Sequence, residues 1–191
     1  IFKSWETQLK ATPAYDKIET DSSGNITISN LVATVGVTET PTKMKLSIGS
    51  ITLENIGGEA NGIISVGSAT FNDTKVEIAG PDNKNVLVEV PKSSATEWHV
   101  AVPGDNPTPL QAFRASMGIA KTMTSGEIKV TAEGQTFTAR GIESAWEGDP
   151  VTGAGKSTTS FNDIVIPEAA LAMADPSGQL KALGYSDLTL N

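Results

Sequence analysis

The feature that most constrains the fold is a succession of short runs in which apolar residues alternate with small polar ones. Thr, Ser, Val and Ile dominate these runs, and Gly, Asn and Asp separate them. β-Branched residues in period-two alternation favour half-buried strands, and the separating residues favour turns. The pattern predicts a mainly β protein, with hairpins joined into an antiparallel sheet that is either a curved open sheet or a sandwich.

One hairpin is predicted in the segment 15–35. The polar cluster Asp21-Ser22-Ser23-Gly24 divides two strand-like runs, and the second run places Ile26 and Ile28 on one face. Asn30 then breaks the alternation. We therefore expect two paired strands with a bulge in the second.

A second hairpin is predicted in the segment 127–139. Ile128 and Val130 alternate before Glu133-Gly134, and Phe137 continues the alternation after it. A Gly-containing pair between two such runs is a strong local signal for a tight turn between antiparallel strands.

Two segments of the chain echo each other. LSIGSITLEN at 46–55 matches ISVGSATFND at 64–73 in its Ser, Gly and Thr positions and in its apolar positions, and 159–166 repeats part of the motif. The explanations are a repeated supersecondary unit or chance similarity in a chain rich in Ser, Thr and Gly. We favour the repeat, because the apolar phase is preserved together with the small residues.

Helical signals are few and short. In 108–120, Thr108 can cap a helix, Pro109 suits its first position, and Gly118 ends it. Weaker signals of the same kind occur in 1–9, 167–174 and 175–184. We expect a few short helices that dock on the sheet.

Four lysines alternate with apolar residues in the predicted strands, namely Lys43, Lys45, Lys75 and Lys129. Charged side chains on edge strands discourage pairing with other chains. We therefore expect these lysines to protect sheet edges.

Length and charge limit the classes of function. The 191 residues suit one domain, 1–191, and the net charge of −8 disfavours both nucleic acid and an anionic membrane surface. No cysteine is present, which excludes thiolate metal sites and cysteine nucleophiles. We see no membrane span or signal peptide, and the Ile1 start and strand-like 188–191 suggest a fragment of a longer protein, with any anchor upstream.

The stretch TGAGKSTTSF at 152–161 contains the Gly-Lys-Ser of nucleotide-binding loops. Those loops need a second glycine where this chain has Pro150, and a helix afterwards, whereas the strand-like 161–166 follows here. Lys156 is therefore expected to be a solvated side chain on a turn, and we predict no nucleotide cofactor.

No catalytic or metal-binding residue is predicted. His99 is the single histidine, so a triad requires it as the base, and no Gly-x-Ser-x-Gly motif accompanies it. If Trp98 and Val100 face the core, His99 points outward. The pairs at 82–83, 105–106 and 162–163 lack the spacing of a calcium loop and suit turns.

Part of the chain resembles a known group of proteins. GNITISNLVATV at 24–35, LSIGSITLEN at 46–55 and the closing GQLKALGYSDLTLN at 178–191 resemble bacterial cell-envelope proteins of the AsmA-like and YdgA-like kind. The resemblance covers about a third of the chain and brings no catalytic residue. It implies a periplasmic, inner-membrane-tethered protein whose curved sheet handles lipid or contacts other envelope components. The membrane segment of those proteins would lie upstream of Ile1.

Three functions follow for such a sheet. We favour a non-enzymatic periplasmic or extracellular envelope protein that binds an apolar ligand, such as a lipid, or an envelope partner. This function predicts an apolar groove longer than a closed core requires, and the candidate groove residues are Ile26, Ile28, Ile48 and Val66.

The two alternatives predict different surfaces. An extracellular structural or adhesive module would be a fully packed sandwich without a cavity, with exposed edge strands for pairing. A hydrolase acting on carbohydrate or peptide would need convergent carboxylates, or His99 beside a hydroxyl and an acid.

Overall fold

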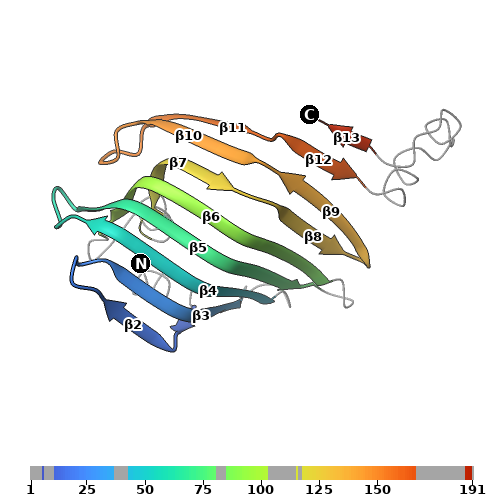
Figure 1. Cartoon of the computed structure of the whole chain (residues 1–191), viewed down its shortest axis with the longest axis horizontal. Helices are drawn as coiled ribbons and strands as arrows, with labels where there is room; N and C mark the ends of the chain where they lie inside the picture. The colour runs from blue at the N-terminus through green and yellow to red at the C-terminus, as the bar shows by residue number, and fades with distance from the viewer. Residues whose placement is uncertain are drawn as a thin grey trace, which may run out of the picture.

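A computed structural model describes residues 6, 11–36, 43–80, 85–102, 115, 118–166 and 188–190. Within them, thirteen strands form one curved antiparallel sheet (Figure 1). The described strands thus confirm the predicted hairpin-built β fold in its curved open form. The N-terminal strands lie at one side of this sheet and the C-terminal strands at the other (Figure 1).

The four longest strands form the middle of the sheet, and shorter strands flank them. The strands are β1 Thr12–Ala14, β2 Lys17–Thr20, β3 Ile26–Gly36, β4 Lys43–Ile56, β5 Ile63–Ala79, β6 Asn85–Ala101, β7 Ile119–Ser125, β8 Ile128–Ala132, β9 Gln135–Arg140, β10 Ile142–Gly148, β11 Gly155–Ser160, β12 Asp163–Ile166 and β13 Leu188–Leu190. Consecutive strands from β3 to β6 pair as neighbours, which is the arrangement that successive hairpins produce.

Beyond β6, consecutive short strands lie end to end, so two of them together occupy the place of one longer strand in the sheet. β7 pairs with the second half of β6 and β8 with its first half. β8 and β9 form a hairpin, and β7 and β10 continue the same antiparallel pairing. β11 and β12 add to β10 and β9 in the same way.

Both predicted hairpins are present. β2 and β3 pair across the turn at 21–24, where the Asp21 carboxylate accepts hydrogen bonds from the amides of Ser23 and Asn25. β8 and β9 pair across Glu133-Gly134. The predicted helices fall almost entirely outside the described residues, although Ala115, in the predicted 108–120 helix, is helical and buried.

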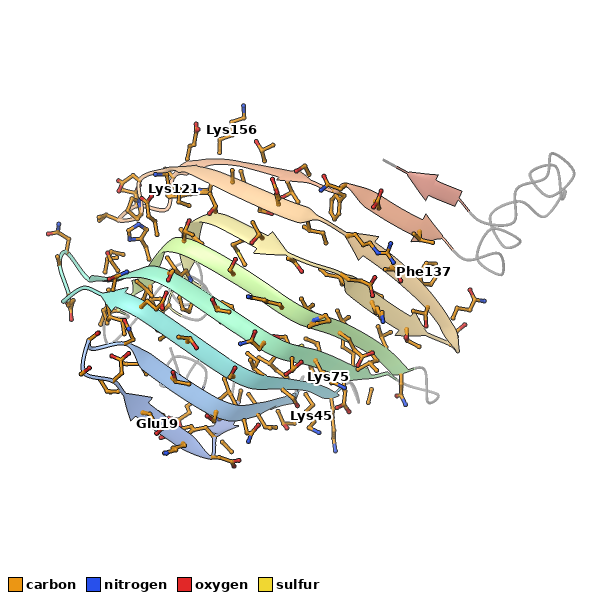
Figure 2. The ribbon with its side chains drawn as sticks, viewed as in Figure 1. Glu19, Lys45, Lys75, Lys121, Phe137 and Lys156 are labelled. Atoms are coloured by element: carbon orange, nitrogen blue, oxygen red, sulfur yellow. The ribbon has the colours of Figure 1, made fainter. Side chains whose placement is uncertain are left out.

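The prediction that four lysines guard sheet edges is wrong. Lys43 and Lys45 lie on β4, Lys75 lies on β5 and Lys129 lies on β8, and each of these positions is paired on both sides. Neighbouring strands cover both sides of these positions, and Lys45 and Lys75 form ion pairs with Glu77 and Glu89 on the next strand. Figure 2 shows Lys45 and Lys75 near the same end of the sheet.

The two faces of the sheet differ in chemistry. One row of paired positions across β3 to β6 reads Ile28, Ile51, Phe71 and Ser93, and a neighbouring row reads Leu31, Ile48, Thr74 and Val90. The row on the opposite face reads Thr27, Thr52, Thr70 and Ser94. One face is therefore mainly apolar, and the other is covered with hydroxyl and charged side chains.

At four positions a single residue interrupts the two-residue alternation of side chains, and we call each interruption a reset. Asn30, Asp73, Asn55 and Glu97 adopt positive φ angles of 53°, 53°, 54° and 45°, and the pairing skips each of them. A residue in the left-handed region breaks the two-residue repeat and bends the strand. The apolar side chains before and after each reset consequently point to the same face.

The sequence echo has a structural counterpart in these resets. β4 and β5 run antiparallel, so Gly49 lies opposite Asp73, and Asn55 lies opposite Gly67. A Cβ atom added to Gly67 would lie 2.7 Å from Asn55 Cβ, and one added to Gly49 would lie 3.1 Å from Asp73 Cβ. Each copy of the motif therefore provides both a positive-φ residue and the glycine that makes room for its partner's side chain.

Candidate functional site

The apolar face contains a cavity of about 440 Å³. This volume lies in the range of sites that take small organic molecules. Strands β3 to β7 form its wall. Its lining residues are Ile26, Ile28, Leu46, Ile48, Ile51, Leu53, Ile56, Ile64, Val66, Phe71, Ala95, Trp98, Val100, Gly118, Ala120 and Met123.

The strand β4 shows how the sequence lines this cavity. Leu46, Ile48, Ile51, Leu53 and Ile56 all lie in the wall, at successive spacings of two, three, two and three residues. Regular alternation from Ile48 would turn Ile51 and Leu53 to the opposite face. The resets in the strand instead keep one continuous apolar surface along its whole length.

A cluster of three alanines, Ala69, Ala95 and Ala120, lies on the β5 to β7 side of the apolar face, and we call it the alanine floor. Ala69 and Ala95 face each other across β5 and β6 and are almost completely buried, with Ala120 nearby in the same cluster. Phe71 and Trp98 pack against this cluster. Their rings meet edge to face with centroids 5.9 Å apart and an interplanar angle of 75°, a favourable aromatic geometry.

A second group of packed side chains lies on the β3 and β4 side, and three of its members, Ile28, Ile48 and Ile51, line the cavity. Ile28, Leu31, Ile48 and Ile51 are buried together, and Leu31 has no exposed surface. Well-packed aliphatic side chains hold fixed rotamers, because neighbours fill the space around them. The wall on the β3 and β4 side is therefore a rigid part of the fold.

All four residues proposed from the sequence lie in the wall. Ile26, Ile28, Ile48 and Val66 line the cavity together, from three adjacent strands. That they hold a ligand stays a prediction. The sequence did not mark the other lining residues as groove residues, and regular alternation counted from Ile48 and Val66 places Ile51, Leu53 and Phe71 on the opposite face. The signal that could have found them is the spacing of two and three residues between apolar positions in 46–56.

On the opposite face, polar side chains of neighbouring strands form hydrogen-bonded pairs. Hydroxyl groups on neighbouring strands bond to each other, as in Ser94 with Thr124 at 2.7 Å and Thr131 with Thr136 at 3.0 Å. Such cross-strand hydroxyl pairs stabilise a solvated sheet surface. Many polar groups of this face are therefore satisfied within the sheet.

Ion pairs complete the polar surface. Lys75 Nζ lies 3.0 Å from Glu89 Oε1, and this hydrogen bond raises the pKa of Lys75. Arg140 Nε donates to Glu127 Oε2 at 2.8 Å, and this hydrogen bond, followed by that from Lys129, lowers the pKa of Glu127. These charged side chains are thus paired with neighbours on the same face.

His99 lies beside a hydroxyl group. Its Nδ1 atom is 3.2 Å from Ser65 Oγ, while Trp98 and Val100 line the cavity on the other face. No hydrogen bond or ion pair joins His99 to a carboxylate in the described residues. The nearby carboxylate of Glu97 instead bonds Lys121 Nζ at 2.6 Å. The arrangement lacks the acid that a triad requires.

The stretch 152–161 has no phosphate-binding geometry. It covers part of the turn after β10 and all of β11, and the Asp149 carboxylate holds the turn by accepting hydrogen bonds from Val151 N and Thr152 Oγ1. Lys156 is exposed on β11, with a strand rather than a helix following it (Figure 2). In the same described regions, no group of three or more acidic or histidine side chains could hold a metal ion.

Comparison of the chain with protein-family models, with curated proteins and with solved structures found no match. Within the part of the chain that the structure describes, no helix is long and apolar enough to cross a membrane. The arguments for function therefore come from the cavity and its surroundings.

Proposed function

We propose that the protein binds an apolar ligand, such as the hydrocarbon chain of a lipid, in the cavity on the apolar face of its sheet. The observation that carries the proposal is the lining itself, in which every side chain is apolar or, in Trp98, mainly apolar. A cavity of this kind holds water poorly, because water there finds too few polar partners. Filling it with hydrocarbon removes apolar surface from water on both sides.

The cavity also separates the three functions that the sequence leaves open. An adhesive sandwich would bury its apolar face against a second sheet, whereas the described strands belong to one sheet with a cavity on that face. A hydrolase would need convergent carboxylates, and no carboxylate is found among the described residues that line the cavity. The cavity therefore supports ligand binding over these two alternatives.

The cellular setting that we propose is the bacterial envelope, in the periplasm or outside the cell. It is supported by the resemblance of 24–35, 46–55 and 178–191 to envelope proteins. A protein that shields hydrocarbon chains from water is useful where lipids leave one membrane surface for another.

Two adjacent residues of β7 provide a test with a matched control. Met123 lines the cavity and is 49% exposed, so it can be changed without opening the core. Thr124 is also exposed but lies on the opposite face, where it bonds Ser94. Met123→Glu would place a carboxylate at the cavity, while Thr124→Glu would place the same charge on the polar face.

The measurement is titration with a fluorescent long-chain alcohol, together with native mass spectrometry and lipid extraction of the purified protein. We expect saturable binding to the unmodified chain and at least tenfold weaker binding to Met123→Glu, because a bound hydrocarbon chain would remove water from the unpaired carboxylate. Binding to Thr124→Glu should be unchanged. A protein that carries no lipid and binds no alcohol would refute the proposal, as would equal losses in the two variants.

A further inference from the structure

We infer that the cavity selects its ligand by the length of an unbranched hydrocarbon chain and not by the head group, and that Ala95 sets this length. The inference rests on the proposed function and narrows it to a class of ligand. It follows from the chemistry of the lining and from the position of the alanine cluster.

The first step concerns the head group. Among the residues that the structure describes, none of the lining side chains carries a charge, a hydroxyl group or an amide. A charged or strongly hydrogen-bonding group placed there would lose its hydration without gaining sufficient partners. The polar end of an amphiphile must therefore remain outside the cavity, where no lining side chain can recognise it.

The second step concerns how far a hydrocarbon chain can extend within the cavity. Ala95 lines the cavity with 2% of its surface exposed, and its strand neighbours on the same face are Ala69 and Met123. Phe71 and Trp98 pack against this alanine cluster. Ala95 is therefore one of the smallest lining residues, and a larger residue at position 95 would occupy space in the cavity that a chain end could otherwise reach.

The third step concerns the shape of the ligand. The wall on the β4 side is built from packed Ile48 and Ile51, and the aromatic pair Phe71 and Trp98 packs at the alanine floor. Packed side chains yield little to a bulky ligand, because each has few alternative rotamers. A flexible chain can follow such a surface.

The test is calorimetric titration with straight-chain alcohols, carboxylates and trimethylammonium amphiphiles of increasing length, each kept below its micelle concentration. Each added methylene should tighten binding about fourfold, which corresponds to the transfer of one CH₂ group from water, until the chain reaches the floor. At equal chain length, the three head groups should bind within about threefold of one another in moderate salt, which screens the net negative charge of the protein.

In the variant Ala95→Leu, the chain length beyond which binding no longer tightens should be about three methylenes shorter, because leucine adds three carbon atoms at the alanine floor. The matched control is Ser94→Leu, which adds a leucine to the adjacent position on the polar face and should leave the length profile unchanged. If Ala95→Leu does not fold, Ala120→Leu supplies the same test, since Ala120 belongs to the same cluster and also lines the cavity.

The outcomes separate the inference from the proposed function. Binding that changes more than tenfold with the head group, or an unchanged length profile in a folded Ala95→Leu or Ala120→Leu variant, would overturn the inference and leave ligand binding intact. Absence of binding by chains of every length would refute the proposed function itself.

Discussion

The two faces of the strands β3 to β7 differ in how their side chains are satisfied, although they share one backbone. On the polar face, hydroxyl groups and opposite charges on neighbouring strands satisfy one another, as Ser94 and Thr124 do. On the apolar face, packed aliphatic side chains such as Leu31 adjoin a cavity that the sheet alone does not fill. The comparison teaches that polar side chains on one face find their partners within the sheet, whereas the other face leaves an apolar cavity.

The largest effect that should distinguish the faces is the removal of a buried side chain. Leu31 is fully buried on the apolar face, and Val32, the next residue, lies on the polar face. Leu31→Ala should lower the free energy of unfolding by about 2–5 kcal/mol, because it loses apolar burial and leaves a cavity. Val32→Ala should cost about 1 kcal/mol. Urea unfolding of both variants checks this, and equal losses would remove the distinction between the faces.

The next effect concerns the resets that keep apolar residues on one face. Gly67→Ala would bring a Cβ atom to 2.7 Å from Asn55 Cβ, so the strands β4 and β5 must shift. We expect a loss of about 1–3 kcal/mol in the free energy of unfolding. Gly58→Ala is the control, since a Cβ atom there has no neighbour within 4 Å, and its effect should stay within about 0.5 kcal/mol.

The smallest effect is a pH dependence that belongs to the polar side of the comparison. Hydrogen bonds from Arg140 and Lys129 lower the pKa of Glu127 from its ordinary 4.5. The unfolded chain therefore binds a proton at higher pH than the folded chain does, so stability from this group is present above about pH 4.5. That stability is lost as the pH falls through the lowered pKa.

Glu127→Gln should reduce the acid-side slope of thermal stability against pH, since it removes this titrating group. An alcohol binding to the apolar face should show no dependence over the same range while the protein stays folded, because no lining residue titrates. If the slope of Glu127→Gln equals that of the unmodified chain, the assignment of the low pKa to this ion-pair cluster is wrong.

Local chemistry explains which parts of the fold the sequence could predict. The hairpins at 17–36 and 128–140 follow from turn residues and short-range alternation, which a single sequence displays directly. The lysines were misplaced because edge and interior strands have the same local pattern. Only the order in which hairpins pair distinguishes them, and that order depends on contacts far apart in the chain.

The candidate groove was predictable in part for a related reason. Ile26 and Ile28 precede the first reset, so simple alternation placed them together. Residues such as Ile51 and Leu53 follow a reset, and alternation counted from Ile48 assigns them to the wrong face. Asn and Asp occur in ordinary turns as well as in positive-φ strand positions, so their local sequence does not identify a reset. The opposed glycine in the neighbouring strand does, once the register is known.

The most direct test of the account asks where a hydrocarbon chain lies on the sheet. A long-chain alcohol with a nitroxide near its end should be added to the methyl-labelled protein, and paramagnetic broadening of the methyl signals measured by NMR. We predict strong broadening at Ile48, Ile51 and Val66 in the cavity wall, and little at Val32 on the polar face. Equal broadening on both faces, or none in the cavity wall, would contradict the account.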